Sequence, residues 1–393
     1  MAARGIRLST LVATVALSMT ACVSMPEPIR TAAPGQSAAI ATRAPIATAS
    51  PSTQVAGTTD PWVLRRLGDA AAPEEYDAVA ATDAGFVVAG SSGPAAERPV
   101  ALSSGDGVVW SREDVPSRAM HPVRLSAWGD RLLAIGEGSS NRCAHPGGEF
   151  DTLVRSAVGR WTEAPFTQSF CAGSGSGATV AFMDGRPWLA LDGVADVPFL
   201  ADSGDGLEWK DRSGLAGDLF IDSLIADANG LWLFGRAGDG SPVLRHSTDG
   251  STWTTTFLAG AGEIVGAFVI DGHVGALASN GERTVLLRRA EDDTWQATPV
   301  DGLPRETLVR LVTADDRVVA IGSRDDGTVD LWATHDGSSW VPVDIPDGLE
   351  PGSSLVDVAI RAETAVLVGQ VPAPDGTVAV GAIWSAPAAL LGG

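Results

Sequence analysis

Short apolar runs recur along the chain at a nearly constant interval. Each run follows another short apolar segment, and a turn containing Asp, Asn or Gly separates the two. Apolar runs of this length between turn residues predict β-strands, and a fixed period predicts a repeat architecture. The interval is 43 to 47 residues except for one of 56 residues, and the runs are Val87–Gly90, Leu133–Gly136, Leu189–Asp192, Trp232–Gly235, Gly275–Ala278, Val319–Gly322 and Val366–Gly369.

A seven-residue phrase, S/T-x-D-G-x-x-W, follows the third predicted strand of most units. It occurs at Ser104–Trp110, Ser203–Trp209, Ser247–Trp253 and Thr334–Trp340, and weaker copies end at Trp161 and Trp295. Asp-Gly between two apolar segments predicts a tight hairpin, because both residues tolerate positive φ, and the Trp is expected to pack into a core. Since four equivalent turns cannot all be one catalytic centre, we expect their carboxylates to accept backbone N–H bonds as structural groups, at Asp106, Asp205, Asp249 and Asp336.

Four short strands in a unit of this length, with a Trp in the last strand, are typical of a β-propeller blade. The seventh unit ends after its third strand, near Trp384, whereas Trp62–Arg65 has the character of a fourth strand. We therefore predict an all-β, seven-bladed β-propeller in which the N-terminal strand closes the last blade and removes an exposed sheet edge. Six blades with stray strands would leave Trp62 and the seventh unit unexplained.

The repeated phrase resembles the Asp-box of sialidase-like (BNR) propellers, with one residue fewer between Asp and Gly. The resemblance implies the propeller architecture. A sialidase would also need a Tyr nucleophile supported by Glu, an Arg cluster and an Asp acid. The chain has a single tyrosine, Tyr76, beside Glu74 and Glu75 in the first blade, and it lacks the Phe/Tyr-Arg-Ile-Pro motif of that family. We expect no catalytic residues, and a sialidase-like glycan hydrolase is the alternative.

The N-terminus predicts export and membrane attachment. Arg4 and Arg7 precede an apolar stretch, which is typical of a signal peptide over residues 1–21. Met19–Cys22 resembles a bacterial lipobox, which implies lipidation of Cys22 and anchoring on the extracytoplasmic face of the membrane; a plain secretory signal is the alternative. Residues 22–59 are rich in Ala, Pro, Ser and Thr and predict a disordered tether. The propeller is expected over residues 60–387, followed by a tail over residues 388–393.

With Cys22 lipidated, an even pair of cysteines remains for an oxidising compartment. Cys143 and Cys171 fall in the two long loops of the unit that has the 56-residue interval. We predict a disulfide between them, with a free catalytic thiol as the alternative.

Charge and histidine spacing narrow the range of partners. The chain has 27 Lys and Arg against 48 Asp and Glu, a net charge of −21, which disfavours nucleic acid as a partner. The five histidines show no pair at ligand spacing, so no metal or cofactor is expected; they are His121, His145, His246, His273 and His335. The acidic stretch Asp325–Asp330 lacks the calcium-loop pattern and is interpreted as a solvated hairpin.

Charged residues recur at one position near the start of the predicted innermost strands. Asp77 and Asp222 lie thirteen residues before Gly90 and Gly235. Arg124, Arg310 and Asp357 occupy the adjacent register. We interpret these five as candidate ligand-binding residues at the mouth of the propeller, although ordinary polar residues at strand ends would show the same pattern. The sequence thus favours a monomeric, non-catalytic cell-surface lipoprotein that binds a protein or glycan partner.

Overall fold

A computed structural model describes most of the predicted propeller. The described residues are 61–68, 73–93, 98–116, 120–138, 149–163, 177–191, 198–279, 283–290, 293–303, 308–314, 316–323, 328–347, 349–350, 352–373 and 378–392. Cys22, the tether, Asp325, Asp326 and both cysteines of the predicted disulfide, Cys143 and Cys171, lie outside this set. Within it, no helix has both the length and the apolar character needed to cross a membrane.

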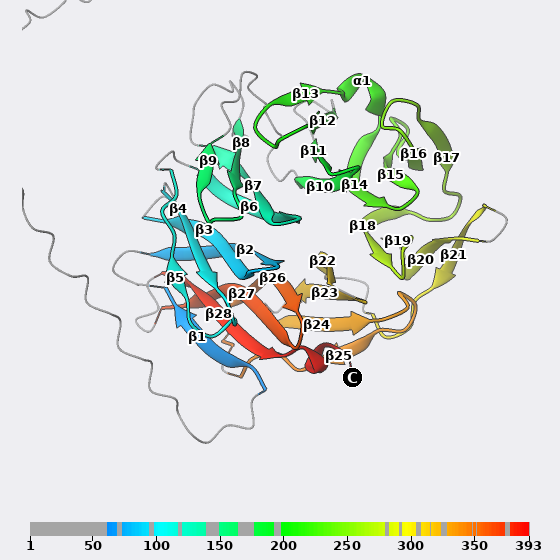
Figure 1. Cartoon of the computed structure of the whole chain (residues 1–393). Helices are drawn as coiled ribbons and strands as arrows, with labels where there is room; N and C mark the ends of the chain where they lie inside the picture. Colours follow the sequence, from blue (N-terminus) through cyan, green and yellow to red (C-terminus); the bar gives the residue numbers. More distant parts are fainter. Residues whose placement is uncertain are drawn as a thin grey trace, which may run out of the picture. The chain divides into compact units, whose positions relative to one another are not determined.

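Seven four-stranded antiparallel sheets form a ring of blades (Figure 1). Blades 1 to 3 contain β2 (Glu74–Thr82), β3 (Gly85–Ser92), β4 (Arg98–Ser104) and β5 (Ser111–Arg112); β6 (Met120–Trp128), β7 (Arg131–Gly138), β8 (Glu149–Arg155) and β9 (Trp161–Glu163); β10 (Thr179–Met183), β11 (Arg186–Leu191), β12 (Phe199–Ser203) and β13 (Trp209–Asp211). Blades 4 and 5 contain β14 (Phe220–Asp227), β15 (Gly230–Arg236), β16 (Pro242–Ser247) and β17 (Thr254–Phe257); β18 (Glu263–Ile270), β19 (His273–Ser279), β20 (Thr284–Arg289) and β21 (Trp295–Pro299). Blades 6 and 7 contain β22 (Leu308–Ala314), β23 (Arg317–Ser323), β24 (Val329–Thr334) and β25 (Val341–Val343); β26 (Ser354–Arg361), β27 (Thr364–Pro372), β28 (Ala379–Pro387) and β1 (Val63–Leu67).

The predicted closure is confirmed by the order of strands in blade 7, which is β1-β28-β27-β26. Val63 pairs with Ser385 and Leu67 pairs with Ala382 in an antiparallel ladder, so the N-terminal strand is the outer strand of the last blade. In Figure 1 the blue strand β1 lies beside the red strand β28. The described residues also include the short helix α1 (Ser213–Ala216) and the 3-10 helix η2 (Ala388–Leu391). Leu391 of η2 is fully buried, so part of the predicted tail packs against the propeller.

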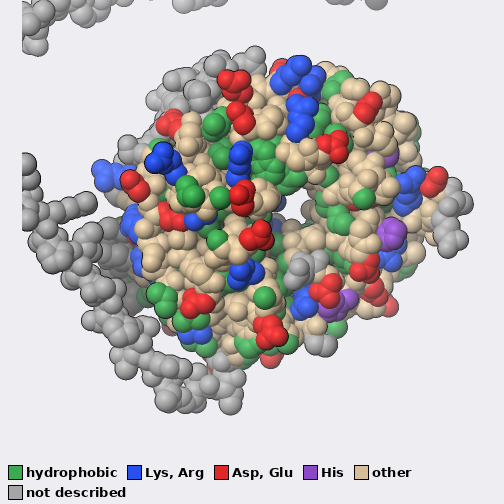
Figure 2. All heavy atoms as spheres, viewed as in Figure 1, with side chains coloured by type: hydrophobic (Ala, Val, Ile, Leu, Met, Phe, Trp, Pro, Cys, Tyr) green, Lys and Arg blue, Asp and Glu red, His purple; other side chains and the backbone are tan. Residues whose placement is uncertain are grey.

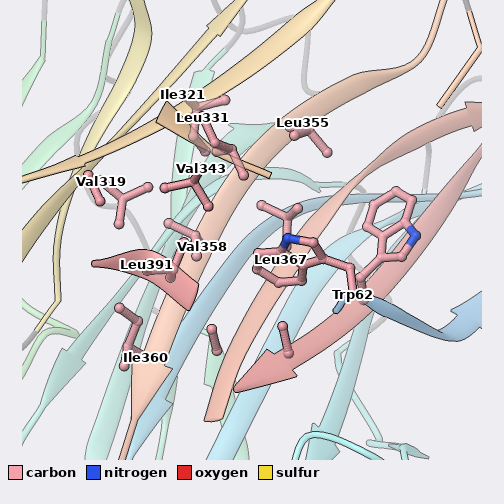
Figure 3. Close-up of a cluster of buried hydrophobic side chains, with 14 of the residues drawn as sticks. Trp62, Val319, Ile321, Leu331, Val343, Leu355, Val358, Ile360, Leu367 and Leu391 are labelled. Carbon is pink, nitrogen blue, oxygen red and sulfur yellow. The ribbon is translucent and has the colours of Figure 1, made fainter. Parts of the chain in front are cut away.

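The hydrophobic core is divided into seven clusters, one between each pair of neighbouring blades. Each cluster contains or contacts the Trp that begins an outer strand, so the repeated Trp packs against the preceding blade. By blade pair, these are Trp110 (7 and 1), Trp161 (1 and 2), Trp209 (2 and 3), Trp253 (3 and 4), Trp295 (4 and 5), Trp340 (5 and 6) and Trp62 (6 and 7). Trp62 is only 2% exposed and lies in the cluster of buried side chains in Figure 3. Its indole Nε1–H donates to the carbonyl of Asp344 at 2.7 Å.

A buried polar network joins the closing strand to blade 1. The Tyr76 hydroxyl donates to Glu74 Oε2 at 2.7 Å and accepts from Arg66 Nε at 2.8 Å. Arg66 and Arg112 both form ion pairs with the Glu74 carboxylate. Tyr76 is 0% exposed, and burial, reinforced by the charge of Glu74, raises the pKa of its phenol. The single tyrosine is therefore a buried structural group.

The Asp-Gly hairpins have one geometry in all four full copies. In the copy at Ser247, Asp249 Oδ1 accepts the N–H groups of Ser251 and Thr252, both at 2.7 Å. These backbone bonds lower the pKa of Asp249. Gly250 has φ +70° and its N–H donates to the Ser247 hydroxyl. Asp106, Asp205 and Asp336 make the same pair of backbone bonds, a pattern typical of a carboxylate in a tight turn.

Innermost strands of the ring share an irregularity near their first residues. A β-bulge interrupts the register between Tyr76 and Ala78, Pro122 and Arg124, Ile221 and Ser223, Ile264 and Gly266, Leu308 and Arg310, and Leu355 and Asp357. A bulge leaves one residue unpaired and redirects the neighbouring side chains. Asp77 and Asp222 are such unpaired residues. Arg124, Arg310 and Asp357 are the first residues after a bulge.

Candidate functional site: the central channel

A cavity of about 560 Å³ lies on the axis of the ring and is lined by the innermost strands. Four of the five sequence-predicted mouth residues line it, namely Arg124, Asp222, Arg310 and Asp357. Figure 2 shows the hollow within the ring, with acidic and basic side chains together on the surrounding face. Because the bulges recur at one level of the strands, residues far apart in the chain converge in this cavity.

Arg310 and Asp357 form a buried ion pair on blades 6 and 7. Arg310 Nη2 lies 3.0 Å from Asp357 Oδ2, and the same oxygen accepts the N–H of Val79 from blade 1 at 3.0 Å. Burial raises the pKa of Asp357, while Arg310 and the N–H of Val79 oppose that rise. Asp357 therefore holds three neighbouring blades together. Arg310 Nε is buried and makes no hydrogen bond with the described residues.

Arg124 is the second guanidinium in the cavity. It makes no hydrogen bond or ion pair with any described residue, although Asp357 attracts it at longer range. Burial and the neighbouring charge of Arg310 lower the pKa of Arg124. A desolvated cation next to a like charge is unfavourable until an anion approaches it. The cavity thus has two guanidinium groups near one saturated carboxylate, which is an anion-binding arrangement.

Asp222 is the unpaired bulge residue of blade 4, one position before the register of Arg124, Arg310 and Asp357. Its Oδ1 accepts from Arg236 Nη2 at 3.4 Å within the same blade. This pair places a carboxylate of the cavity wall on a blade different from those of the two channel arginines. The cavity therefore has both signs of charge on different walls, which favours a polar ligand of defined orientation over an apolar one.

Asp77 lies beside the cavity in a second polar cluster, which also contains Glu75 and His121. His121 Nε2 lies 3.7 Å from Asp77 Oδ2, and one ligand atom from each of the three residues lies within 4.8 Å of the others. Gln370 Nε2 donates to Asp77 Oδ1 at 3.4 Å. Burial raises the pKa of Asp77 to about 6; His121 opposes this rise and Glu75 adds to it.

The sequence pattern located the channel residues but missed two members of the Asp77 cluster. Charged residues at two adjacent repeat registers were the signal for Asp77, Arg124 and Arg310. His121 and Glu75 carry no such signal, because His121 comes from the next blade and the histidines are scattered along the chain. Their meeting depends on the distance between two neighbouring blades, which the sequence does not give.

A smaller cavity of about 300 Å³ lies on the rim between blades 4 and 5. Its walls include Trp232, Trp295 and Arg289, with Asp227 at its edge. Trp232 stacks on His246 at 3.8 Å between ring centroids, and the guanidinium carbon of Arg289 lies 5.5 Å from a ring centroid of Trp232. Trp232 thus already contacts two side chains of the protein, so we place the candidate site in the channel.

These features define a seven-bladed β-propeller with a charged central channel. No protein-family model and no curated protein matches the chain. Among solved structures, a catalytically inactive virginiamycin B lyase from Staphylococcus aureus with quinupristin is similar over 83% of this chain and 99% of its own, with 9% identity and a TM-score of 0.54. Trypanosoma rangeli sialidase with sialic acid has 14% identity over 72% of this chain and 56% of its own, with a TM-score of 0.45. The six-bladed Aleuria aurantia lectin has 11% identity over 74% of this chain and 100% of its own, with a TM-score of 0.45. The likeness at these identities is one of fold.

Proposed function

We propose that this chain is a lipid-anchored binding protein on the extracytoplasmic face of a bacterial membrane, and that its propeller binds a carboxylate-bearing protein or glycan partner in the channel. The lipobox-like segment Met19–Cys22 and the Pro-rich residues 22–59 support attachment and a tether. The charged cavity supports binding.

The observation that carries the binding proposal is the state of Arg124. Its guanidinium lies in a cavity without an ion-pair partner among the described residues, beside the Arg310–Asp357 pair. A ligand carboxylate would supply the missing counter-charge in a desolvated setting, where charge-assisted and bidentate hydrogen bonds are strong. The chain as a whole is acidic, with a net charge of −21, so the local guanidinium groups rather than the net charge would attract an anionic ligand.

Binding without hydrolysis is supported by the position of the tyrosine. A sialidase-like reaction would use a tyrosine nucleophile, and the single tyrosine of the chain is Tyr76. Tyr76 is fully buried and hydrogen-bonded to Glu74 and Arg66, outside the channel lining. A ligand sugar in the channel would not reach it.

The test is calorimetric titration with two sets of probes that share a carboxylate. One set is uronic and sialic acid oligosaccharides, and the other is short peptides with free C-terminal carboxylates. We expect saturable binding in one set and a loss of at least tenfold in affinity for Arg124→Gln, because a charge-assisted bond contributes roughly 1.5–3 kcal/mol. Arg131→Gln is the control, because Arg131 lies over the ring of Trp128 rather than in the channel. Equal binding by both variants, or preference for neutral probes, would overturn the proposal.

Anchoring is tested separately by cell fractionation of Cys22→Ala. The substitution removes the thiol that lipidation requires, so the variant should leave the membrane fraction or keep its signal segment. A variant that fractionates and migrates like the original would contradict the lipid anchor without affecting the channel site.

A further inference from the structure

Three potential metal ligands meet where blades 1 and 2 adjoin. Glu75 and Asp77 come from β2, and His121 comes from the start of β6. Their nearest ligand atoms all lie within 4.8 Å of one another, and Asp77 Oδ2 and His121 Nε2 are 3.7 Å apart. Two atoms bound at about 2.1 Å to one metal ion lie at most about 4.2 Å apart, so only a small inward movement would complete the coordination.

Neighbouring groups hold the far side of two of the three ligands, His121 and Asp77. Ser91 Oγ lies 3.0 Å from His121 Nδ1, and Gln370 Nε2 donates to Asp77 Oδ1. Ser91 is fully buried, so its hydroxyl can fix the imidazole orientation. With Nδ1 as the donor in that contact, Nε2 keeps the lone pair that faces Asp77. Hydrogen bonds to the far side of a ligand orient it in the metal sites of proteins.

One carboxylate oxygen on the inner face of the cluster has no hydrogen-bond partner among the described residues. Asp77 is only 8% exposed, and its Oδ2 is buried without a hydrogen bond from the described part of the chain. A buried carboxylate oxygen without a partner is costly, and a cation offsets that cost. Arg310 is the charged group that approaches Asp77 from blade 6, but its Nη2 already pairs with Asp357.

We propose that Glu75, Asp77 and His121 bind a divalent transition-metal ion, Zn²⁺ or Mn²⁺, and leave its remaining coordination positions open to the solvent. One imidazole nitrogen with two carboxylate oxygens suits these ions better than Ca²⁺, which takes six to eight oxygen ligands. Glu75 and His121 are partly exposed, so an ion can enter from solvent. This site is independent of the proposed carboxylate ligand, because metal binding can be measured with the metal alone.

The test is titration of the full chain, prepared without a polyhistidine tag and stripped with EDTA, with ZnCl₂, MnCl₂ and CaCl₂. We expect one saturable site for Zn²⁺ or Mn²⁺ and a loss of at least tenfold in affinity for Asp77→Asn and for His121→Gln. Ser91→Ala keeps all three ligands and should lower the affinity by ~10–100-fold, because it removes the hydrogen-bond partner that orients the His121 ring. With Mn²⁺, the electron paramagnetic resonance signal of the free ion gives an independent count of bound ions.

His335→Gln is the matched control. His335 Nδ1 lies 3.6 Å from Asp316 Oδ2, so it forms a histidine–carboxylate pair of similar geometry on the exposed rim. The control should bind as the original protein does. Melting curves recorded before titration establish that each variant is folded. If Asp77→Asn does not fold, the comparison is made with His121→Gln. Absence of a saturable site, a preference for Ca²⁺, unchanged binding by both ligand variants, or equal loss in the control would overturn the proposal.

Discussion

Gly250 meets two requirements of the repeated hairpin, a positive φ and close packing against the preceding blade. Its φ of +70° is a conformation that L side chains rarely adopt. A Cβ at this position would also lie 2.4 Å from Cζ2 and 2.8 Å from Cη2 of Trp188 on the preceding blade. Glycine is therefore required both by the turn and by the packing of one blade on the next. Gly107, Gly206 and Gly337 are crowded by neighbouring blades in the same way.

Gly250→Ala should destabilise the propeller more than Gly272→Ala does. Gly272 has φ +73°, but no described atom lies within 4 Å of the place that an alanine methyl would take, so it shares the backbone strain without the clash. We expect ~1–2 kcal/mol from strain in both variants and ~1–3 kcal/mol more for Gly250 from overpacking against Trp188. Urea denaturation measures the difference. Equal losses would show that the hairpin tip does not pack on the preceding blade.

At the level of single residues, the sequence predicted the features that recur from blade to blade. The Asp-Gly-Trp phrase identified the hairpin turns because each copy repeats the same local chemistry. The shared register of Arg124, Arg310 and Asp357 located the channel for the same reason. Glu75 and His121 could not be paired from the sequence, because their meeting depends on how far apart two neighbouring blades lie.

Among the elements, β1 is held by side-chain interactions with blade 1 as well as by its hydrogen-bonded ladder with β28. Arg66 of β1 reaches Glu74 and Tyr76 of β2 in blade 1, so the seam between the last and first blades includes a buried charge network. Burial tends to raise the pKa of Glu74, but the hydroxyl of Tyr76 and the charges of Arg112 and Arg66 lower it below its usual value of 4.5. The ionised form is thus favoured in the folded state.

Glu74→Gln should destabilise the protein at neutral pH and much less in acid. Because the folded-state pKa of Glu74 is lowered, the carboxylate contributes stability above pH 4.5, and that contribution is lost as the pH falls through the folded-state value. Urea midpoints of variant and original protein, measured from pH 7 to pH 3, should therefore converge. Glu208 is exposed, so Glu208→Gln serves as a control that should change the urea midpoint little at any pH. A difference in urea midpoint between Glu74→Gln and the original protein that persists unchanged in acid would contradict this explanation.

The elements themselves were largely predictable, since the recurring apolar runs marked the second strand of all seven blades. The bulges were not predictable, because one unpaired residue leaves no mark on an apolar pattern until the pairing partner is known. The 3-10 helix η2 was also missed, since Leu391 becomes part of the core only through contact with blades 6 and 7.

For the whole molecule, closure depends on the N-terminal strand. Deleting residues 60–66 removes most of the β1–β28 ladder and the buried Trp62 from the cluster between blades 6 and 7. Loss of the Trp side chain alone costs ~3–5 kcal/mol, a large share of the ~5–15 kcal/mol of a typical domain. Deleting residues 24–55, within the predicted tether, should leave the melting temperature nearly unchanged. Similar melting of the two truncations would mean that the strand does not stabilise the ring.

The proposed ligand site is the central channel. The most direct measurement is a crystal structure of the protein with the acidic saccharide or peptide that binds in the titrations. We predict the ligand carboxylate within hydrogen-bond distance of the Arg124 guanidinium, in the cavity that Arg310 and Asp357 also line. A ligand seated instead in the rim cavity between blades 4 and 5, against Trp232 and Trp295, would contradict it.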